Sequence, residues 1–329
     1  RIIEIKMKKL LQNSLGKTGL KIPELILGGG FVGGVMIHSD KATQEQAIHR
    51  CLEVGADWID TAQMYGNGES ETNIGEVLAG MPAAHRPRIS TKIALGPEDL
   101  HDVNGSVRRA IEASLERLKL DKVEVYQLHN RIGSGDSDWL STYDILKPGG
   151  VADAFQYIKE AGLADHIGIT ALGEPNSVRD VIASERFETA QVYYNLLNPS
   201  AGKNVSPNFG TTDFRGILGA CYAHGLGVFG IRILAAGVLA TNERHGREIP
   251  ITENSDPDAE AARADAVWRV LGKRDEDHAA TAIRYALAEQ KISTSIFGAA
   301  SLQHIEVAFS AAFDGPMEAE AVNKIDSLL

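Results

Sequence analysis

Hydrophobic positions along the chain follow two periodicities, and the two kinds of segment alternate. Short runs such as 167–169 and 227–231 are apolar at successive positions, which is typical of strands buried on both faces. The segments between them carry apolar residues every three or four positions, which predicts helices. In 107–118, for example, Val107, Ile111, Leu115 and Leu118 fall on one helical face.

The alternation amounts to eight strand–helix repeats with no linker between them. We predict strands at 24–27, 57–60, 88–92, 123–129, 166–170, 189–194, 227–234 and 293–297, and helices at 43–54, 70–78, 107–118, 151–161, 177–184, 211–223, within 256–273, and at 278–289, 302–312 and 317–328. Strands joined through helices pair in parallel. Eight such units favour a closed (β/α)8 TIM barrel of the α/β class over an open doubly wound sheet.

The ends of the chain add to this barrel. Residues 11–22 predict an N-terminal β-hairpin around Gly16-Lys-Thr-Gly19, and 317–328 an extra C-terminal helix. We expect a single domain over 1–329, with Met7 as the natural start and residues 1–6 as an extension.

Composition narrows the class of protein. The chain is 43% hydrophobic and 23% charged, the balance of a soluble globular domain. A net charge of −11 disfavours nucleic acid and anionic membranes as partners. No apolar run approaches the ~20 residues of a membrane span, and no signal peptide is evident, so we expect a cytoplasmic protein. Cys51 and Cys221 match no metal or redox spacing, and we predict no metal site.

Four polar side chains follow the predicted barrel strands. Asp60, Lys92 and His129 each end a strand, and Tyr65 lies in the loop after the first of these strands, before a Gly-Asn-Gly turn. Each alone reads more simply as a cap, a solvated charge or a packed side chain. Because active sites of these barrels lie at the carboxyl ends of the strands, we expect the four to meet at one mouth.

Together these four groups suit proton transfer beside a hydride transfer. A carbonyl that accepts hydride needs a proton, which a tyrosine phenol can supply although its ordinary pKa is about 10. A neighbouring lysine ammonium favours the phenolate, and an aspartate keeps that lysine charged. A histidine can donate a hydrogen bond that orients the substrate oxygen.

The glycine-rich segment 28–34 matches the G-x-G-x-x-G pattern of dinucleotide-binding folds. In those folds the glycines open directly onto a helix. Here we expect the helix only near Thr43, so the segment is interpreted as flexible backbone lining the barrel mouth.

Several motifs resemble the aldo-keto reductase superfamily across nearly the whole chain. They include Asp60-Thr-Ala-x-x-Tyr65-Gly66, the strand-end Lys92 and Leu128-His129, with further similarity at 15–21, 162–170, 191–196 and 296–301. The layout is most similar to the aldose 1-dehydrogenase branch. The resemblance implies a metal-free barrel that binds NADH or NADPH across its mouth, with Asp60, Tyr65, Lys92 and His129 as the catalytic tetrad.

The resemblance also implies a set of cofactor contacts. Thr170 and Gln191 would hold the nicotinamide carboxamide. The remaining assigned positions are Gly29 and Gly30 in the first loop, Ile231 and Arg232, then Leu234, Ala235 and Gly237 along the pyrophosphate, and Gly298, Ala299 and Ser301 near the adenosine phosphates. The last three lie at a helix N-terminus, which suits an anion.

Three departures from the family pattern bear on these contacts. Ala171 replaces a common Asn, which puts one carboxamide contact in doubt. Ile231-Arg232 stands where an aromatic and a Ser are common; Arg232 is open to a phosphate contact, a ligand anchor or a pairing with an acid. The C-terminal segment lacks basic residues for a 2′-phosphate, so we expect NAD or dual use over strict NADP, unless Lys273 or Arg274 supplies the charge.

We predict an NAD(P)-dependent oxidoreductase acting on a small carbonyl or sugar substrate, with oxidation of an aldose at C1 to a lactone favoured. Phe31, Met64 and Trp139 are the expected substrate contacts, and loops 130–150 and 240–275 would cover the mouth. A general aldehyde or ketone reductase is nearly as well supported. A non-catalytic nucleotide-binding module and an aldolase with Lys92 as Schiff-base nucleophile are the alternatives from other classes.

Overall fold

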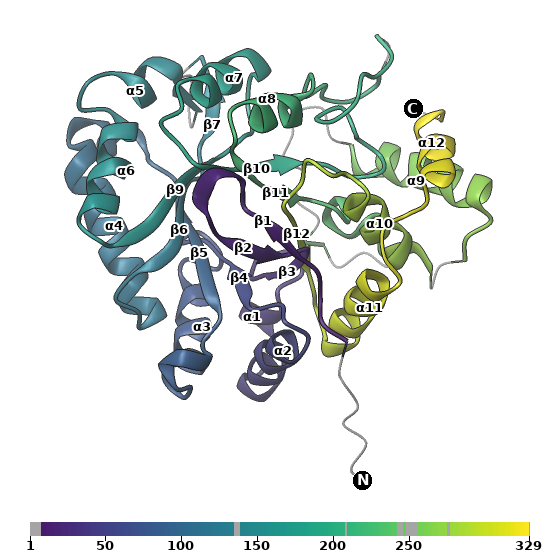
Figure 1. Cartoon of the computed structure of the whole chain (residues 1–329), viewed down its shortest axis with the longest axis horizontal. Coiled ribbons are helices and arrows are strands. Elements are labelled where there is room, and N and C mark those ends of the chain that lie inside the picture. The colour runs from purple at the N-terminus through teal and green to yellow at the C-terminus, as the bar shows by residue number, and fades with distance from the viewer. Residues whose placement is uncertain are drawn as a thin grey trace.

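The fold is a closed barrel of eight parallel strands surrounded by helices (Figure 1). It is seen in a computed structural model that describes residues 8–134, 139–207, 209–241, 246–247, 256–274 and 277–328. The barrel strands, in their order around it, are β3 (Leu25–Gly28), β4 (Trp58–Asp60), β5 (Arg88–Ile93), β6 (Val123–Leu128), β9 (Ala164–Thr170), β10 (Thr189–Tyr193), β11 (Gly227–Ile231) and β12 (Thr294–Gly298). The predicted (β/α)8 barrel is confirmed.

The outer layer consists of amphipathic helices whose apolar faces belong to the hydrophobic core. They are α2 (Lys41–Glu53), α3 (Glu69–Ala79), α4 (Val103–Leu118), α6 (Val151–Glu160), α7 (Pro175–Ala183), α8 (Ile217–Ala223), α9 (Pro257–Leu271), α10 (His278–Leu287) and α11 (Leu302–Phe313). In α4, Val107, Ile111, Leu115 and Leu118 are all buried, as the periodicity predicts.

Some shorter elements differ from the sequence prediction. The predicted loop 130–150 contains β7 (Arg131–Gly133), β8 (Trp139–Ser141) and α5 (Thr142–Leu146), and a four-residue helix α1 (Val35–His38) follows the glycine-rich segment. These elements are too short to establish a period. Strand β11 ends at Ile231, earlier than predicted, because Arg232 has a left-handed backbone with φ of 58°.

The N-terminal hairpin closes the barrel at the amino ends of its strands. Strands β1 (Gln12–Ser14) and β2 (Lys21–Pro23) flank the 3₁₀ turn η1 (Gly16–Thr18). The hairpin crosses the barrel in Figure 1. Its apolar side chains join the barrel floor in one buried cluster: Leu15, Ile22, Ile26, Trp58, Val125 and Phe229. At the opposite end of the barrel, where the strands have their carboxyl ends, loops form the surface.

The predicted C-terminal helix is present as α12 (Ala319–Asp326) and lies beside α9 (Figure 1). Polar contacts at its last turn attach it, since Tyr285 Oη donates to Asp326 Oδ1 at 2.6 Å and Lys203 pairs with the same carboxylate. Among helices of the described ranges, none is both long and apolar enough for a membrane span. The proposed extension at residues 1–6 lies outside the described residues.

Candidate active site

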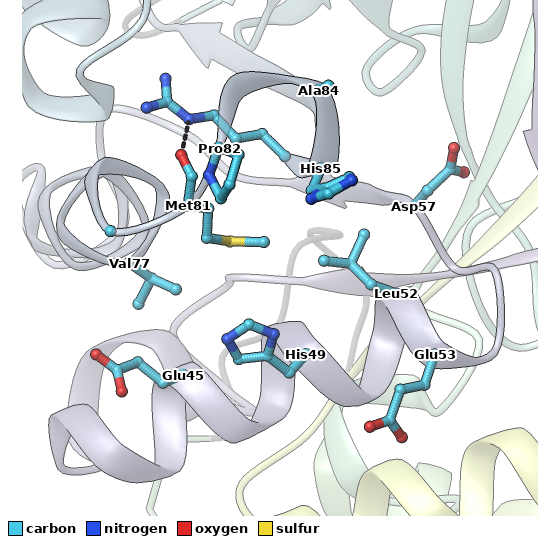
Figure 2. A pocket seen from close by; sticks show the side chains of 12 residues that line it. Glu45, His49, Leu52, Glu53, Asp57, Val77, Met81, Pro82, Ala84 and His85 are labelled. Atoms are coloured by element: carbon cyan, nitrogen blue, oxygen red, sulfur yellow. Dashed lines mark hydrogen bonds between the residues drawn. The ribbon is translucent and has the colours of Figure 1, made fainter.

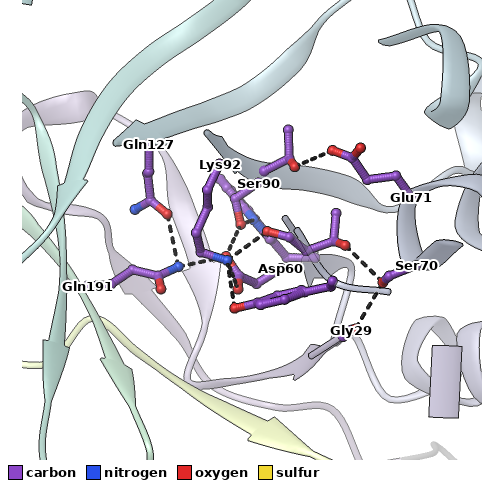
Figure 3. Close-up of polar contacts among 12 residues, drawn as sticks. Gly29, Asp60, Ser70, Glu71, Ser90, Lys92, Gln127 and Gln191 are labelled. Atoms are coloured by element: carbon purple, nitrogen blue, oxygen red, sulfur yellow. Dashed lines mark hydrogen bonds and ion pairs between the residues drawn. The ribbon is translucent and has the colours of Figure 1, made fainter. Parts of the chain in front are cut away.

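Asp60 and Lys92 form a buried ion pair at the carboxyl ends of neighbouring strands. Asp60 ends β4 and Lys92 lies near the end of β5, and Lys92 Nζ donates to Asp60 Oδ2 at 2.6 Å (Figure 3). Both side chains are excluded from solvent, at 3% and 0% exposure. Lys92 Nζ also donates to the Thr61 carbonyl at 2.6 Å. Burial opposes the charge on Lys92, but Asp60 and Tyr65 outweigh it and raise its pKa.

Tyr65 approaches this pair from the loop between β4 and α3. Three consecutive residues after it, Gly66, Asn67 and Gly68, have positive φ, so the Gly-Asn-Gly turn reverses the chain with little strain. The turn places Tyr65 Oη 3.4 Å from Lys92 Nζ, and that nitrogen lies 4.8 Å from the centre of the tyrosine ring. The side chain of Tyr65 remains partly exposed.

His129 completes the group from the residue after β6. Its backbone N–H donates to the Ile93 carbonyl at 2.7 Å, and its ring meets the Tyr65 ring edge-on at 5.7 Å. Burial, with a smaller contribution from Lys92, lowers the pKa of His129 to about 3. The imidazole is therefore neutral at physiological pH. Its Nδ1 has no hydrogen-bond partner among the described residues.

The structure thus brings together all four predicted residues, and it adds others that the sequence analysis missed. Ser90 Oγ donates to Asp60 Oδ1 at 2.8 Å, and Gln127 accepts from Gln191 Nε2 at 2.9 Å. A usable signal existed: Ser90 and Gln127 lie two positions before Lys92 and His129, so each shares a strand face with its neighbour. A neutral side chain inside a strand carries no sign of function by itself.

The loop after β3 packs directly on the loop after β12. A Cβ on Gly33 would lie 2.5 Å from the Ala299 nitrogen, so only glycine permits this approach. The Gly29 carbonyl accepts from Ser70 Oγ at 2.9 Å, and Gly30 faces the edge of the Tyr65 ring. The predicted cofactor positions Gly29, Gly30, Gly298 and Ala299 therefore border one region of the mouth.

Thr170 and Gln191 lie on adjacent strands, and each provides a test of whether a nicotinamide fits. Thr170 ends β9, and its buried Oγ1 has no hydrogen-bond partner among the described residues. Gln191 Nε2 donates to Asp60 Oδ1 at 2.7 Å and to Gln127 Oε1 at 2.9 Å. An unpaired hydroxyl and an unpaired imidazole nitrogen at the mouth suit a polar ring such as a carboxamide-bearing pyridine.

The segment after β11 is a tight turn of strained backbone. Three residues other than glycine, Arg232, Ala235 and Ala236, have positive φ here. Gly237, which follows them, also has positive φ. The Ala235 and Gly237 amides donate within the turn, to the Arg232 and Leu234 carbonyls, each at 2.8 Å. Strain of this kind is often retained at ligand sites. Of the predicted pyrophosphate contacts Leu234, Ala235 and Gly237, the last two therefore already donate their backbone N–H groups to carbonyls of the turn.

Arg232 interacts electrostatically with Tyr65 at the mouth of the barrel. Its side chain is partly buried, and loss of solvent lowers its pKa, while Tyr193, Tyr65 and Glu260 stabilise the guanidinium. The Arg232 carbonyl accepts from Asn195 Nδ2 at 2.9 Å, which holds the unusual backbone in place. Neighbouring Ile231 ends β11 and is partly buried.

Ser301 is the N-cap of α11, and its Oγ accepts from the His304 amide at 3.3 Å. The Ala300 amide donates to His304 Nδ1 at 3.3 Å. The Ser301 hydroxyl oxygen and the neighbouring Ala300 amide therefore already have hydrogen-bond partners within the protein. Arg274, one candidate for a 2′-phosphate, is largely exposed and lies 3.7 Å from Asp277.

The three predicted substrate residues have different surroundings. Phe31 and Met64 remain exposed, at 37% and 56%, and Phe31 packs edge-on to His38. Trp139 is not in an irregular loop as predicted. It begins β8, where its ring packs against Gly133 with Arg131 5.8 Å from its centre. The predicted covering loop 240–275 lies partly outside the described residues.

A separate groove of about 770 Å³ lies between α2 and the segment running from α3 through the 3₁₀ turn η2 (Ala83–His85) (Figure 2). His49, Leu52, Met81 and His85 line it, among other residues. It borders the ends of α2 and α3 and the residue before β4, at the amino ends of the strands, so it is remote from Lys92. No cluster of three potential metal ligands occurs in the described ranges.

Comparison with known proteins agrees with this geometry. The model of the Aldo/keto reductase family matches residues 24–329, and the chain belongs to that family of oxidoreductases. It is 26% identical to an L-galactose dehydrogenase of Arabidopsis thaliana over 98% of this chain and 95% of that protein. It is 28% identical to an uncharacterized oxidoreductase of Bacillus subtilis over 68% of this chain and 67% of that protein.

Solved structures show the same fold. The holo form of an aldo-keto reductase from Bacillus halodurans, AKR11C1, superposes with a TM-score of 0.72 at 20% identity, covering 97% of this chain and 96% of that one. A glycerol dehydrogenase from Gluconobacter oxydans, AKR11B4, gives a TM-score of 0.69 at 20% identity, covering 97% and 94%.

Proposed function

We propose that this oxidoreductase transfers hydride between a nicotinamide cofactor and a small carbonyl or hydroxyl compound, and that it oxidises an aldose at C1 to a lactone. The observation that carries the proposal is the chain of contacts from Asp60 through Lys92 to Tyr65, with His129 beside the phenol. A non-catalytic binding module has no use for a buried ion pair aimed at a partly exposed phenol.

In the oxidative direction Tyr65 acts as the general base. Its phenolate, stabilised by the Lys92 ammonium, takes the proton of the sugar C1 hydroxyl as the C1 carbonyl forms. Neutral His129 donates a hydrogen bond to the same oxygen and orients it. When bound, the nicotinamide ring would accept the hydride that leaves C1. In the reductive direction Tyr65 returns its proton to the new alkoxide.

The residues around the mouth support cofactor binding there. We propose that Thr170 and Gln191 contact the carboxamide, that Gly29, Gly30, Ile231 and Arg232 border the cofactor, and that the turn at 234–237 and the start of α11 lie along its phosphates. Helix α11 contains no lysine or arginine that could contact a 2′-phosphate, so we infer use of NAD, or of both cofactors, rather than NADP alone.

The sugar assignment rests on the relative named L-galactose dehydrogenase, which aligns over nearly its full length. Reduction is the second candidate, favoured by a relative named 6-dehydroglucose reductase that is 35% identical over 27% of this chain. A Schiff-base aldolase is disfavoured because Lys92 is fully buried and held as an ammonium by Asp60, whereas an attacking amine must lose its proton.

A panel of substrates tests the proposal. We expect absorbance of reduced nicotinamide to appear with L-galactose, L-fucose or D-arabinose and NAD, with a lactone trapped by hydroxylamine. The same sugars with NADP, and simple aldehydes with NADH and NADPH, measure cofactor preference and direction. Absence of any nicotinamide signal across the panel, together with borohydride trapping of a carbonyl on Lys92, would favour the aldolase instead.

Replacement of Tyr65 tests its proposed role in proton transfer. Tyr65→Phe should lower kcat at least about 100-fold, within the range that one general acid contributes. Cofactor affinity, measured by quenching of tryptophan fluorescence, should stay within about threefold, because the ring and its contact with Lys92 remain. A variant that kept near-normal turnover would show that another group transfers the proton.

A further inference from the structure

We propose that Ser90 and Gln191 are positioning residues for the reaction: by donating to one oxygen of Asp60 they withdraw part of its negative charge from Lys92, and so leave the lysine free to stabilise the Tyr65 phenolate. This rests on the proposed role of Tyr65. The contacts involved are those of Asp60 Oδ1, the carboxylate oxygen to which Lys92 does not donate.

The two oxygens of Asp60 have separate partners. Oδ2 accepts only the charged donor in the contacts described, Lys92 Nζ at 2.6 Å. Oδ1 accepts two neutral donors, Ser90 Oγ at 2.8 Å and Gln191 Nε2 at 2.7 Å (Figure 3). Both distances lie within hydrogen-bonding range, and hydrogen bonds to an ionised acceptor are stronger than those between neutral groups.

Both neutral donors are held in orientation by a further contact. Trp58 Nε1 donates to Ser90 Oγ at 3.2 Å, which directs the serine hydroxyl hydrogen toward Asp60. Gln127 Oε1 accepts the second N–H of Gln191 at 2.9 Å. Gln127 is itself oriented because its Nε2 donates to Thr189 Oγ1 at 3.3 Å. The amide of Gln191 therefore presents nitrogen, not oxygen, to the carboxylate.

These contacts bear on the charge that reaches Tyr65. In the part of the chain that the structure describes, Lys92, His129 and Arg232 are the charged or titratable groups that contact the phenol or act on it electrostatically, and Asp60 pairs with Lys92. A carboxylate with fully concentrated charge would cancel much of the ammonium field at the phenol. Donors on Oδ1 spread that charge without neutralising it, so Asp60 still holds Lys92 in place.

Another serine of the barrel offers a matched control. Ser90 and Ser295 both lie inside barrel strands and are 0% and 1% exposed. Ser295 Oγ, unlike that of Ser90, has no hydrogen-bond partner within the described ranges. Ser90→Ala and Ser295→Ala therefore remove the same atom from the same type of position, and only the first removes a donor to Asp60.

The test is an alkaline titration of the full chain labelled with 13C at the tyrosine ζ carbon, without cofactor. The eight tyrosines give eight signals, and Tyr65→Phe identifies the one that belongs to Tyr65. Burial raises the pKa of Tyr126, Tyr193, Tyr194 and Tyr285, which removes four signals from the range of interest.

We expect Ser90→Ala to move the titration midpoint of the Tyr65 signal upward by about half a pH unit, a fraction of the roughly 1–3 units that a full neighbouring charge produces. Ser295→Ala should leave it unchanged. Gln191→Met provides a second variant with the same expected direction. If a substrate is known, the pH–rate profile of Ser90→Ala should shift equally.

An unchanged or lowered midpoint in both Ser90→Ala and Gln191→Met would overturn the inference, as would an equal rise in Ser295→Ala. The measurement needs no turnover. A shifted midpoint in a protein that oxidises no sugar would therefore support the charge distribution while contradicting the proposed reaction.

Discussion

His129 illustrates how burial sets the protonation state of a single side chain. An unfolded histidine has a pKa of about 6.5, whereas burial lowers the pKa of His129 to about 3. Between these values the unfolded chain binds a proton that the folded chain excludes. This contribution to stability is therefore complete above pH 6.5 and is lost as the pH falls toward 3.

We predict that His129→Gln makes the protein less sensitive to acid. Between pH 6 and pH 4 the free energy of unfolding should fall less steeply than in the parent, by up to roughly 1.4 kcal/mol per pH unit. Urea unfolding at each pH measures it. His49→Gln, which removes an exposed imidazole from α2, is the control. Parallel pH curves for the parent and His129→Gln would contradict the lowered pKa of His129.

At the scale of elements, α3 and α4 are held in close contact behind the candidate active site. Glu71 in α3 accepts from Arg117 Nε at 2.7 Å and from Thr91 Oγ1 of β5 at 2.5 Å. A Cβ on Gly75 would lie 2.0 Å from the Arg117 carbonyl oxygen. Because α3 begins just after the Tyr65 turn, this contact also bears on where the phenol lies.

Two helical glycines should respond in opposite directions to the same substitution. Gly75→Ala must push α3 from α4 and should destabilise the fold by about 2 kcal/mol. Gly219→Ala lies on the exposed side of α8 with nothing within 4 Å of the added Cβ, and should stabilise by roughly 0.5–1 kcal/mol. Urea unfolding compares them. A loss of stability in both variants would show that close packing is not what requires Gly75.

At the scale of the whole molecule, the packed N-terminal hairpin and the candidate active site lie at opposite ends of the barrel. The hairpin closes the amino end with Leu15, which is fully buried, while Asp60, Lys92 and Tyr65 meet at the carboxyl end. Parallel strands separate the two ends by the length of the barrel. The groove beside α2 and η2 also lies at the amino end.

Truncation of the hairpin should therefore lower stability without altering catalysis. Leu15→Ala should reduce the free energy of unfolding by about 2–4 kcal/mol, as for other buried leucines. Leu11→Ala, in the exposed part of the same hairpin, should change it by less than about 0.5 kcal/mol. With any substrate found in the panel, kcat at low temperature should be equal in both variants. A selective loss of kcat in Leu15→Ala would argue against this separation.

The periodicity of the chain was sufficient to predict the (β/α)8 barrel. Helices and strands buried on both faces differ in hydrophobic period, and eight strand–helix repeats favour a closed barrel over an open sheet. It also placed Asp60, Lys92 and His129 at strand ends, because a parallel barrel assembles those ends at one mouth. Short elements such as α1, β7 and α5 were missed, since few residues cannot establish a period. The end of β11 was misplaced because Ile-Arg-Ile-Leu continues an apolar run through a left-handed turn.

Residue type and order along the chain thus determined the barrel and the four candidate catalytic residues. Only the tertiary structure decided which further polar side chains contact them and through which atoms. Ser90, Gln127 and Gln191 come from three different strands, and their hydrogen bonds depend on strand register and side-chain rotation. Such a donor differs from an ordinary buried amide or hydroxyl only by what lies opposite it, and that is a property of the folded chain.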